Sequence, residues 1–306
     1  MMRRRRGPPF AAYPTNDRLS LVLLNVAGKV PLPDSPEQLV SSAPELEALP
    51  VVAQRALAIL RDERTSVDMI SNLLGTDQAL ASAVLRYANS ARAMPNRRIA
   101  NLREAVARIG QRALSEVLVR ACAGPMLDRG LPPYALPRSI AWRHAATVST
   151  ASRALADLLK TGSEEAGVAG LLHDVGKMVL TSVVPEAAAE AVSIARSRRM
   201  PVWQAEQEVL GFHHGAVGAA LLRSWGLPDS VVYAVAFHHQ PEAADSALAT
   251  IVSLADAAAF SVGAVGGGGA CPQPAWDPAP AYAMGATPEQ IQDFLDNLKC
   301  VEDGAL

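Results

Sequence analysis

The sequence predicts an all-α protein, and three features of its 306 residues carry that prediction. Apolar residues recur at helical spacing along most of the chain, whereas the period-two alternation of strands is hard to find. Alanine and leucine, which favour helices, are abundant, and aromatic residues make up only 5%. Half of the residues are hydrophobic, which is enough for a large core in one domain or in two coupled domains.

Composition also limits the classes of function. The net charge is −2 with 19% charged residues, which is typical of a soluble globular protein and does not favour a general nucleic-acid binder. We interpret the basic run 3–6 as part of a solvated tail rather than a contact for nucleic acid or anionic lipid. No run reaches the roughly 18 apolar residues of a membrane span. Three widely spaced cysteines suit a reducing compartment, so we expect a cytoplasmic protein with neither a membrane nor a nucleic-acid partner.

Residues 1–44 are expected to form a tail and a lead-in, with one short helix over 17–27. An N-terminal helical subdomain is expected over 45–130. Helix caps are predicted at Ser66, at Thr76 or Asp77, and at Asn101, where a glutamate three residues later completes a capping-box pattern. The helices of this subdomain are predicted over about 50–62, 66–75 and 77–90, with further helix between 101 and 127.

The stretch 129–137 is rich in proline and glycine and is interpreted as a hinge, after which a second helical subdomain is expected over 131–262. Residues 263–286 have the composition of a flexible linker. The C-terminal segment 287–306 should form a helix, from a cap at Thr287 to about residue 299, and a tail. The helices of the second subdomain are predicted over about 138–160, 163–180, 184–199, 202–210, 214–226, 228–239 and 246–262.

Residues 66–90 scan as helix, glycine-containing turn and helix, which is also the pattern of a DNA-binding helix-turn-helix. A recognition helix needs base-reading side chains near its start, and this one offers Gln78 but mostly alanine and leucine. We therefore favour a packing pair of helices inside the N-terminal subdomain.

The six histidines are confined to the second subdomain, where two aspartates also fall within apolar helical sequence. A single histidine on an apolar helix is usually a hydrogen-bonded core residue, so the prediction depends on the whole set. Carboxylates are rarely buried without a partner, and neutral imidazoles with carboxylates suit Zn, Fe, Mn or Ni. The set predicts a metal site, with a purely structural polar cluster as the alternative. Its members are His144, His173, Asp174, His213, His214, His238, His239 and Asp256.

Neighbouring residues in the set help to assign their roles. The pair His173–Asp174 is expected inside the helix 163–180, where its side chains would point about 100° apart. His238 and His239 cannot both face one interior point from a regular helix unless the helix ends there, as Pro241 suggests. His214 opens a helix with an apolar stripe, so it is expected to face inward rather than its neighbour 213.

The order of these residues resembles the HD superfamily of metal-dependent phosphohydrolases, and more closely the HDOD domain of bacterial signalling proteins. The resemblance covers about 48–262 and implies an HD-like helical bundle preceded by an N-terminal helical subdomain. It is carried by the stretches LPVVAQRALAILRD, TDQALASAVLRYANSA, IANLREAVARIG, WRHAATVSTASRALA, AGLLHDVGKMVL, EQEVLGFHHGAVGAALLRSWGLPDSVVYAVAFHHQP and IVSLADAAAF.

The resemblance also implies roles for single residues. Asp174 would bridge two ions if a second ion were bound, and Lys177 could hold a phosphate oxygen, with a solvated charge as the alternative. These two residues are the expected catalytic groups. The implied ligands of one or two divalent transition metal ions are His144, His173, Asp174 and Asp256, with His214, His238 and His239 as the additional histidines of two-metal members.

Two functions follow from the resemblance. The first is a regulatory module that binds a signalling protein or a small nucleotide-like ligand. The second is a metal-dependent phosphohydrolase acting on a nucleotide or phosphodiester. The Gly–Tyr–Pro signature of the branch that degrades cyclic di-GMP does not follow His238–His239, which disfavours that substrate. The final helix 287–299, on its tether, could occupy a groove of the domain and inhibit it.

Overall fold

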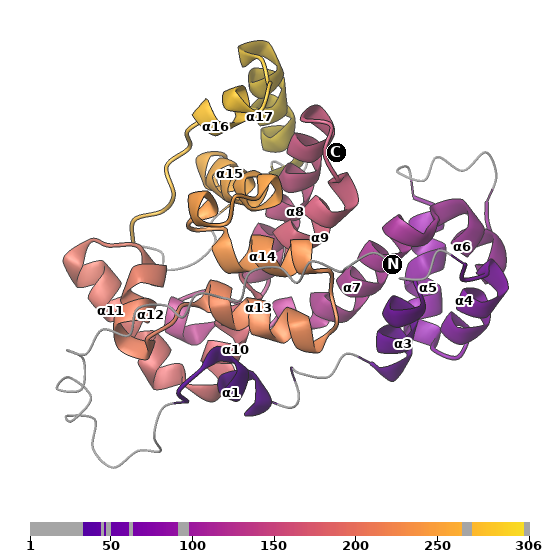
Figure 1. The fold of residues 1–306 in the computed structure, drawn as a ribbon, viewed down its shortest axis with the longest axis horizontal. Helices are drawn as coiled ribbons and strands as arrows, with labels where there is room; N and C mark the ends of the chain where they lie inside the picture. The colour runs from indigo at the N-terminus through magenta and orange to yellow at the C-terminus, as the bar shows by residue number, and fades with distance from the viewer. Residues whose placement is uncertain are drawn as a thin grey trace, which may run out of the picture.

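The computed structural model describes residues 33–43, 46, 50–60, 64–90, 98–264 and 271–302. Within these ranges the chain is helical, and the only β-type pairing is an isolated bridge between Leu131 and Leu136. This confirms the predicted all-α fold. Figure 1 shows a smaller group of helices on one side, joined through α7 to a larger bundle that holds the rest of the described chain.

Three helices of the smaller group begin at the caps that the sequence predicts. The side chain of Ser66 accepts a hydrogen bond from the backbone of Met69, that of Asp77 from Ala79 and Leu80, and that of Asn101 from the third residue after it. Each bond satisfies amide groups that a helix start leaves without partners. The helices are α3 (Val51–Ile59), α4 (Val67–Leu74), α5 (Gln78–Ala88), α6 (Leu102–Ile109) and α7 (Gln111–Leu127).

Helices α4 and α5 pack within this group. Leu80, Val84 and Ala88 of α5 are buried, as are Ile70 and Leu74 of α4. α5 lies against α6 and α7. The arrangement agrees with the packing interpretation of 66–90. Gly110, at a φ of 78°, separates α6 from α7.

The larger bundle contains the predicted second subdomain. α8 packs on α9 and α15, while α13 packs on α10 and α14. Two short 3₁₀ helices, Pro132–Tyr134 and Pro241–Ala243, lie at the hinge and after α14. The helices are α8 (Ile140–Leu158), α9 (Ser163–Leu172), α10 (Val175–Val183), α11 (Pro185–Arg198), α12 (Val202–Leu210), α13 (His214–Ser224), α14 (Asp229–Phe237) and α15 (Ala247–Ser261).

The prediction of one continuous helix over 163–180 is wrong. α9 ends at Leu172 and α10 begins at Val175, so His173 and Asp174 form the junction between two helices. Asp174 leaves the helical region, with φ −99° and ψ 5°. The pair is therefore not held to the 100° separation of neighbouring residues on one helix, and both side chains can reach the same point.

A glycine sets the distance between α10 and α13. A Cβ atom on Gly176 would overlap the backbone oxygen of His214 and lie 2.7 Å from the backbone nitrogen of Gly218. Only a residue without a side chain allows this approach. Gly176 thus brings the start of α13 against the His–Asp junction.

The lead-in is more ordered than predicted. Its described part contains α1 (Pro36–Ser41), which packs on α13 with Leu39 and Val40 buried. Trp225 donates a hydrogen bond from Nε1 to the backbone oxygen of Leu46, at 3.2 Å. The described residues 33–43 and 46 therefore pack with the larger bundle. The helix predicted over 17–27 lies outside the described residues.

The flexible linker predicted over 263–286 is also more structured in its described part. Cys271 and Ala281 are buried, and a short helix, α16 (Ala279–Ala283), forms. The final helix, α17 (Pro288–Glu302), begins as predicted, because Thr287 accepts a bond from the backbone of Gln290. α17 packs on α8, and the inhibitory role suggested for it stays a prediction, as do the domain boundaries.

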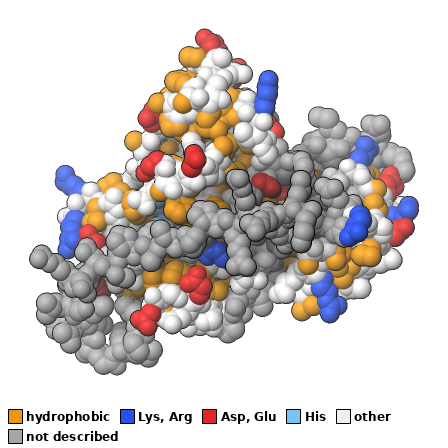
Figure 2. Space-filling view, viewed as in Figure 1, with side chains coloured by type: hydrophobic (Ala, Val, Ile, Leu, Met, Phe, Trp, Pro, Cys, Tyr) orange, Lys and Arg blue, Asp and Glu red, His pale blue; other side chains and the backbone are white. Residues whose placement is uncertain are grey.

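The described surface is mixed in character. Figure 2 shows acidic and basic side chains interspersed on the displayed face. In the portion of the chain that the structure covers, no helix combines the length and apolarity needed to cross a membrane. The three cysteines are free thiols.

Candidate metal centre

The predicted ligands come together inside the larger bundle. They arise from five places in the chain: α8, the α9–α10 junction, the first residue of α13, the two residues after α14, and α15. Most of their side chains are buried, and Asp174 and His239 are half-buried. The residues that meet are all seven predicted ligands and the predicted phosphate-binding lysine: His144, His173, Asp174, Lys177, His214, His238, His239 and Asp256.

One cluster gathers around the His–Asp junction. The Nε2 atoms of His144 and His173 lie 3.2 Å apart. Oδ1 of Asp256 lies 3.1 Å from the first and 3.7 Å from the second. Oδ2 of Asp174 lies 3.5 Å from His173 Nε2 and 4.0 Å from His144 Nε2. Two imidazoles and two carboxylates thus face one buried point, which is the donor set of a first-row transition metal site.

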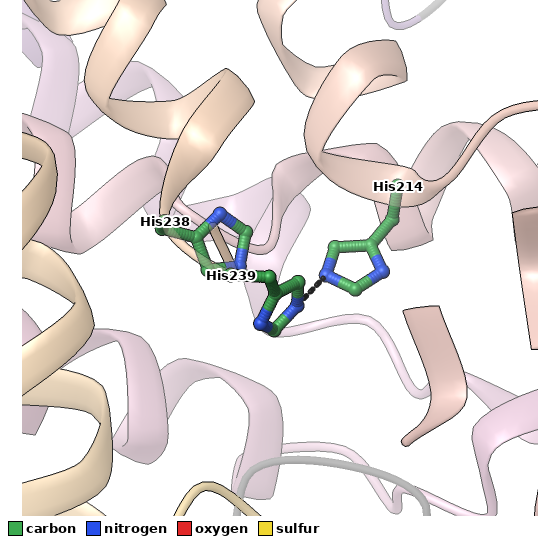
Figure 3. A group of neighbouring side chains, drawn as sticks. All are labelled: His214, His238 and His239. Carbon is green, nitrogen blue, oxygen red and sulfur yellow. Dashed lines mark hydrogen bonds between the residues drawn. The ribbon is translucent and has the colours of Figure 1, made fainter. Parts of the chain in front are cut away.

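A second cluster consists of histidines alone. Figure 3 shows His238 and His239, at the end of α14, pointing toward His214 at the start of α13. The Nε2 atoms of His214 and His239 lie 2.9 Å apart. Neighbouring residues of a helix point in different directions. Because α14 ends at Phe237, the two consecutive histidines lie beyond it, and both side chains reach the site.

Asp174 joins the two clusters. Its Oδ1 atom lies 3.2 Å from Nε2 of His214, while Oδ2 faces the first cluster. Oδ2 also accepts a hydrogen bond from Nζ of Lys177 at 2.7 Å. Lys177 is buried and lies over the ring of Tyr134, with Nζ 5.8 Å from the ring centre. The alternative of a solvated charge at this lysine is therefore wrong.

Partners outside the clusters orient four of the rings. Nδ1 of His144 lies 3.1 Å from the backbone oxygen of Ala264, and Nδ1 of His173 lies 2.8 Å from that of Gly170. Nδ1 of His238 lies 2.8 Å from the backbone oxygen of Val235. Carbonyl oxygens only accept hydrogen bonds, so we assign the proton to Nδ1 in each ring. The lone pair of each Nε2 then points inward, as in metal-ligating histidines.

Glu206 of α12, which is not among the predicted site residues, orients the fourth ring. Its Oε2 atom accepts bonds from Nδ1 of His214 at 2.6 Å and from the same residue's backbone at 2.8 Å. Its Oε1 atom accepts a 2.7 Å bond from the hydroxyl of Tyr134, which belongs to the hinge. Glu206, Tyr134 and His214 are all buried. Helix 202–210 also carries Glu208, and helical spacing distinguishes the two glutamates. Glu206 lies on the stripe of Val202, Ala205 and Val209, whereas Glu208 lies on the other side of the helix.

His213 stays outside the two clusters. Its Nδ1 atom accepts a bond from the backbone of Gly215 at 3.1 Å, so it caps α13. The expectation that His214 rather than His213 faces the centre is therefore met. Burial lowers the pKa of His213 to about 4.

The electrostatics of the centre favour the metal-binding states of most of the predicted ligands. His214 is the exception, because the effect of burial on its pKa is outweighed by Glu206 and Asp174, which raise that pKa. Burial lowers the pKa of His173 and holds the pKa values of His238 and His239 well below their usual range, so these rings are neutral. Burial acts to raise the pKa of Asp174, but nearby Lys177 and imidazoles outweigh it and hold that pKa well below normal. Neutral imidazole and ionised carboxylate are the forms that ligate a cation.

A cavity leads to the centre. Its volume is about 220 Å³, and its polar lining includes Asp174, Lys177, His214, His238, His239 and Asp256. The remaining lining is largely apolar, from Trp203, Phe260 and several prolines. The indole of Trp203 stacks on the ring of His239, with the two planes inclined by 14°. A small ligand could therefore reach the clustered side chains from one side.

The donor set fits a metal ion. Nε2 of His238 is buried and has no hydrogen-bond partner among the described residues, although its other nitrogen is paired. A buried polar atom without a partner is costly, and facing imidazole lone pairs repel one another. A cation shared by these atoms would remove both penalties. The histidines and carboxylates present would hold one or two ions.

The helical bundle and its interior set of histidines and aspartates define a protein with the HD-type arrangement. The chain matches the HDOD domain over residues 46–241, and it belongs to the HDOD family of the HD superfamily.

Comparisons with known proteins agree with this assignment. An uncharacterized protein of Treponema pallidum is 31% identical over 206 residues, which cover 65% of this chain and 39% of that protein. Ribonuclease Y of Thermus thermophilus is 28% identical over 164 residues, which cover 54% of this chain and 20% of that enzyme. The chain thus spans less than half the length of either curated relative.

Solved structures share the fold. An HDOD domain protein of unknown function from Geobacter sulfurreducens superimposes with a TM-score of 0.67 at 22% identity, covering 88% of this chain and 98% of that one. A candidate phosphohydrolase from Shewanella amazonensis also gives 0.67, at 24% identity, covering 87% of this chain and 95% of that one. These likenesses confirm an HD-like helical bundle with an N-terminal helical subdomain.

Proposed function

We propose that this protein is a signalling module that holds an HD-type metal centre and uses it to bind a small phosphorylated, nucleotide-like ligand. One observation carries the proposal: side chains from five separated parts of the chain present Nε2 and carboxylate atoms to one buried centre beside a cavity. A purely structural polar cluster would not need an approach for a ligand.

The residues would have different roles in this centre. His144, His173, Asp174 and Asp256 would hold one divalent transition metal ion, and His214, His238 and His239 would hold a second, with Asp174 between the two. Lys177 lines the cavity and would pair with a phosphate oxygen of the ligand. Bound metal would supply a Lewis acid for phosphate oxygens and acidify a bound water. Glu206 keeps the lone pair of His214 Nε2 directed inward.

Metal analysis of the full chain tests the centre. Purified protein reconstituted separately with Mn, Fe and Zn should retain one or two ions per chain after gel filtration. Titration with inorganic phosphate and with nucleoside monophosphates should then show binding that depends on the metal. A chain that retains no metal under any of these conditions contradicts the proposal.

A second candidate function is hydrolysis of a nucleotide or phosphodiester. It is favoured by Lys177, whose amino group lies 2.7 Å from a carboxylate of the centre and also lines the cavity. The similarity to ribonuclease Y, named for cleaving RNA, points to the same chemistry. Lys177 would neutralise charge that develops on the phosphoryl group, and Asp174 would hold the reacting centre in place.

Hydrolysis assays separate the two functions. Metal-loaded protein is incubated with nucleotides and with a generic phosphodiester, and the Asp174→Asn variant is the control. Turnover that is lost in the variant establishes an enzyme. Metal-dependent binding without turnover supports the signalling module, which could also act through a signalling protein partner.

A further inference from the structure

A short segment beyond the family match forms part of the wall of the cavity. The match ends at residue 241, whereas Pro272, Gln273 and Pro274 line the same cavity as Lys177 and His239. We call residues 271–276 the strap. In Figure 1 the described chain that precedes α16 runs from the α11–α12 region to α16.

The strap is anchored at both ends. Cys271 is 5% exposed, and its Sγ atom lies 3.9 Å from the backbone oxygen of Val192 in α11. At the other end, the ring of Trp276 lies 6.2 Å from that of Phe294 in α17. Trp276 also packs against the apolar cluster beneath α17. The strap therefore runs from a contact with α11 to a contact with α17, and its residues 272–274 line the cavity.

Its composition makes the strap stiff where it meets the cavity. Each of its two prolines fixes its own φ near −65° and restricts the residue before it. The side chain of Gln273 donates a 3.1 Å hydrogen bond to the backbone oxygen of Cys271, which adds a local constraint. A segment with fixed ends and restricted torsions cannot easily swing aside to open a groove.

The cavity beside the strap is small. The cavity volume of about 220 Å³ is below the roughly 300–1,000 Å³ of sites that hold drug-sized ligands. A phosphate with a small attached group fits such a volume, whereas a polymer chain needs an open groove on both sides of the reacting bond. Lys177 supplies a cation in the wall, and Ser253 adds a hydroxyl.

We propose that the strap closes the metal centre to nucleic-acid strands and selects a small phosphorylated ligand. This inference depends on the proposed function, because it specifies the ligand of the same centre. It assigns a role in specificity to Pro272 and Pro274.

The test compares two double variants of the full, Mn²⁺-loaded chain. Pro272→Gly with Pro274→Gly loosens the strap at the cavity. Pro278→Gly with Pro280→Gly makes the same two kinds of change just beyond the strap, at positions that do not line the cavity, and is the matched control. Binding of inorganic phosphate is measured by calorimetry, and binding of a short labelled oligothymidylate by fluorescence anisotropy.

The strap variant is expected to bind the oligothymidylate about ten-fold more tightly than the wild-type chain. Its affinity for phosphate should change by less than about three-fold, since the metal ligands and Lys177 are untouched. The control should match the wild type with both probes. If the double variant does not fold, the single change Pro274→Ala is used, with a smaller gain expected in the same direction.

Two results would overturn the inference, and they are distinguishable. Equal binding of the oligothymidylate by all three proteins, at unchanged Mn²⁺ content, means that the strap does not exclude strands, while the proposed function stands. A wild-type chain that takes up no Mn²⁺ overturns the proposed function and the role of the strap together.

Discussion

The N-terminal helices α3–α6 and the helices α8–α15 pack by the same rules but bury different chemistry. In the described part of α3–α6, the buried side chains are apolar except for Ser71. The interior of α8–α15 contains imidazoles, carboxylates and a lysine. An apolar interior stabilises a fold without further partners, whereas buried ionisable groups cost free energy unless others satisfy them.

The difference places the candidate functional site in α8–α15 and not in α3–α6. Strongly perturbed pKa values and buried charges cluster at functional sites, and here they occur where the cavity reaches the interior. Helix α7 lies between the two regions in sequence and contacts the second through a buried ion pair between Glu116 and Arg153 of α8. Substitutions at equivalent positions should therefore change ligand chemistry in one region and only stability in the other.

The largest difference between the two regions is expected in metal content when an aspartate is replaced. Asp174→Ala should abolish metal retention, because it removes the carboxylate shared by both clusters and leaves Lys177 without its partner. The loss of affinity should exceed the roughly 10–100-fold that follows loss of a supporting residue. Metal content after gel filtration measures it. Asp68→Ala, in the exposed surface of α4, should retain the wild-type metal content.

The next largest difference between the two regions is expected in the free energy of unfolding when a glycine is replaced. Gly176→Ala should reduce the free energy of unfolding by about 3 kcal/mol or prevent folding, since its Cβ would overlap the backbone of α13. Gly75→Ala, at the exposed end of α4 with a φ of −63°, should change it by no more than about 0.5 kcal/mol. Chemical denaturation followed by circular dichroism measures both. Equal effects would show that the close approach of α10 and α13 is not required.

A smaller effect is expected for the glutamate that supports His214. Glu206→Gln should weaken metal binding by about 10–100-fold, because the amide cannot accept all three hydrogen bonds that the carboxylate accepts. Glu208→Gln in the same helix is the matched control, since that glutamate pairs with Arg198 at the surface. Competition with a fluorescent chelator measures the affinity, and an unchanged value in Glu206→Gln would contradict the assigned role.

The smallest effect should come from the surface of the N-terminal helices. Arg103 pairs with Asp68 between α6 and α4, and both side chains are largely exposed. Such pairs contribute little and are screened by salt. Arg103→Ala should leave metal content unchanged and should lower the unfolding midpoint at low salt only. A large loss of stability at high salt would show that this pair does more than a surface contact.

Local rules were sufficient for most of the helices. The caps at Ser66, Asp77, Asn101 and Thr287 formed as predicted, because each depends on side chains and amides within three residues. The prediction of one helix over 163–180 failed because the apolar run continues through 173–174, although the chain there turns to place both side chains in the centre. The composition of 263–286 likewise gave no sign of the contacts that Cys271 makes on α11.

The sequence by itself determined the helical class and the cap positions, since helical periodicity and capping are local properties. It also supplied the candidate ligand residues, through the resemblance to a known family. Only the tertiary structure decided that Asp174 lies between the two clusters, that Glu206 contacts His214, and that the strap lines the cavity. Those facts depend on the distances between helices that are remote along the chain. Such distances are set by close packing, as at Gly176, and no single segment contains them.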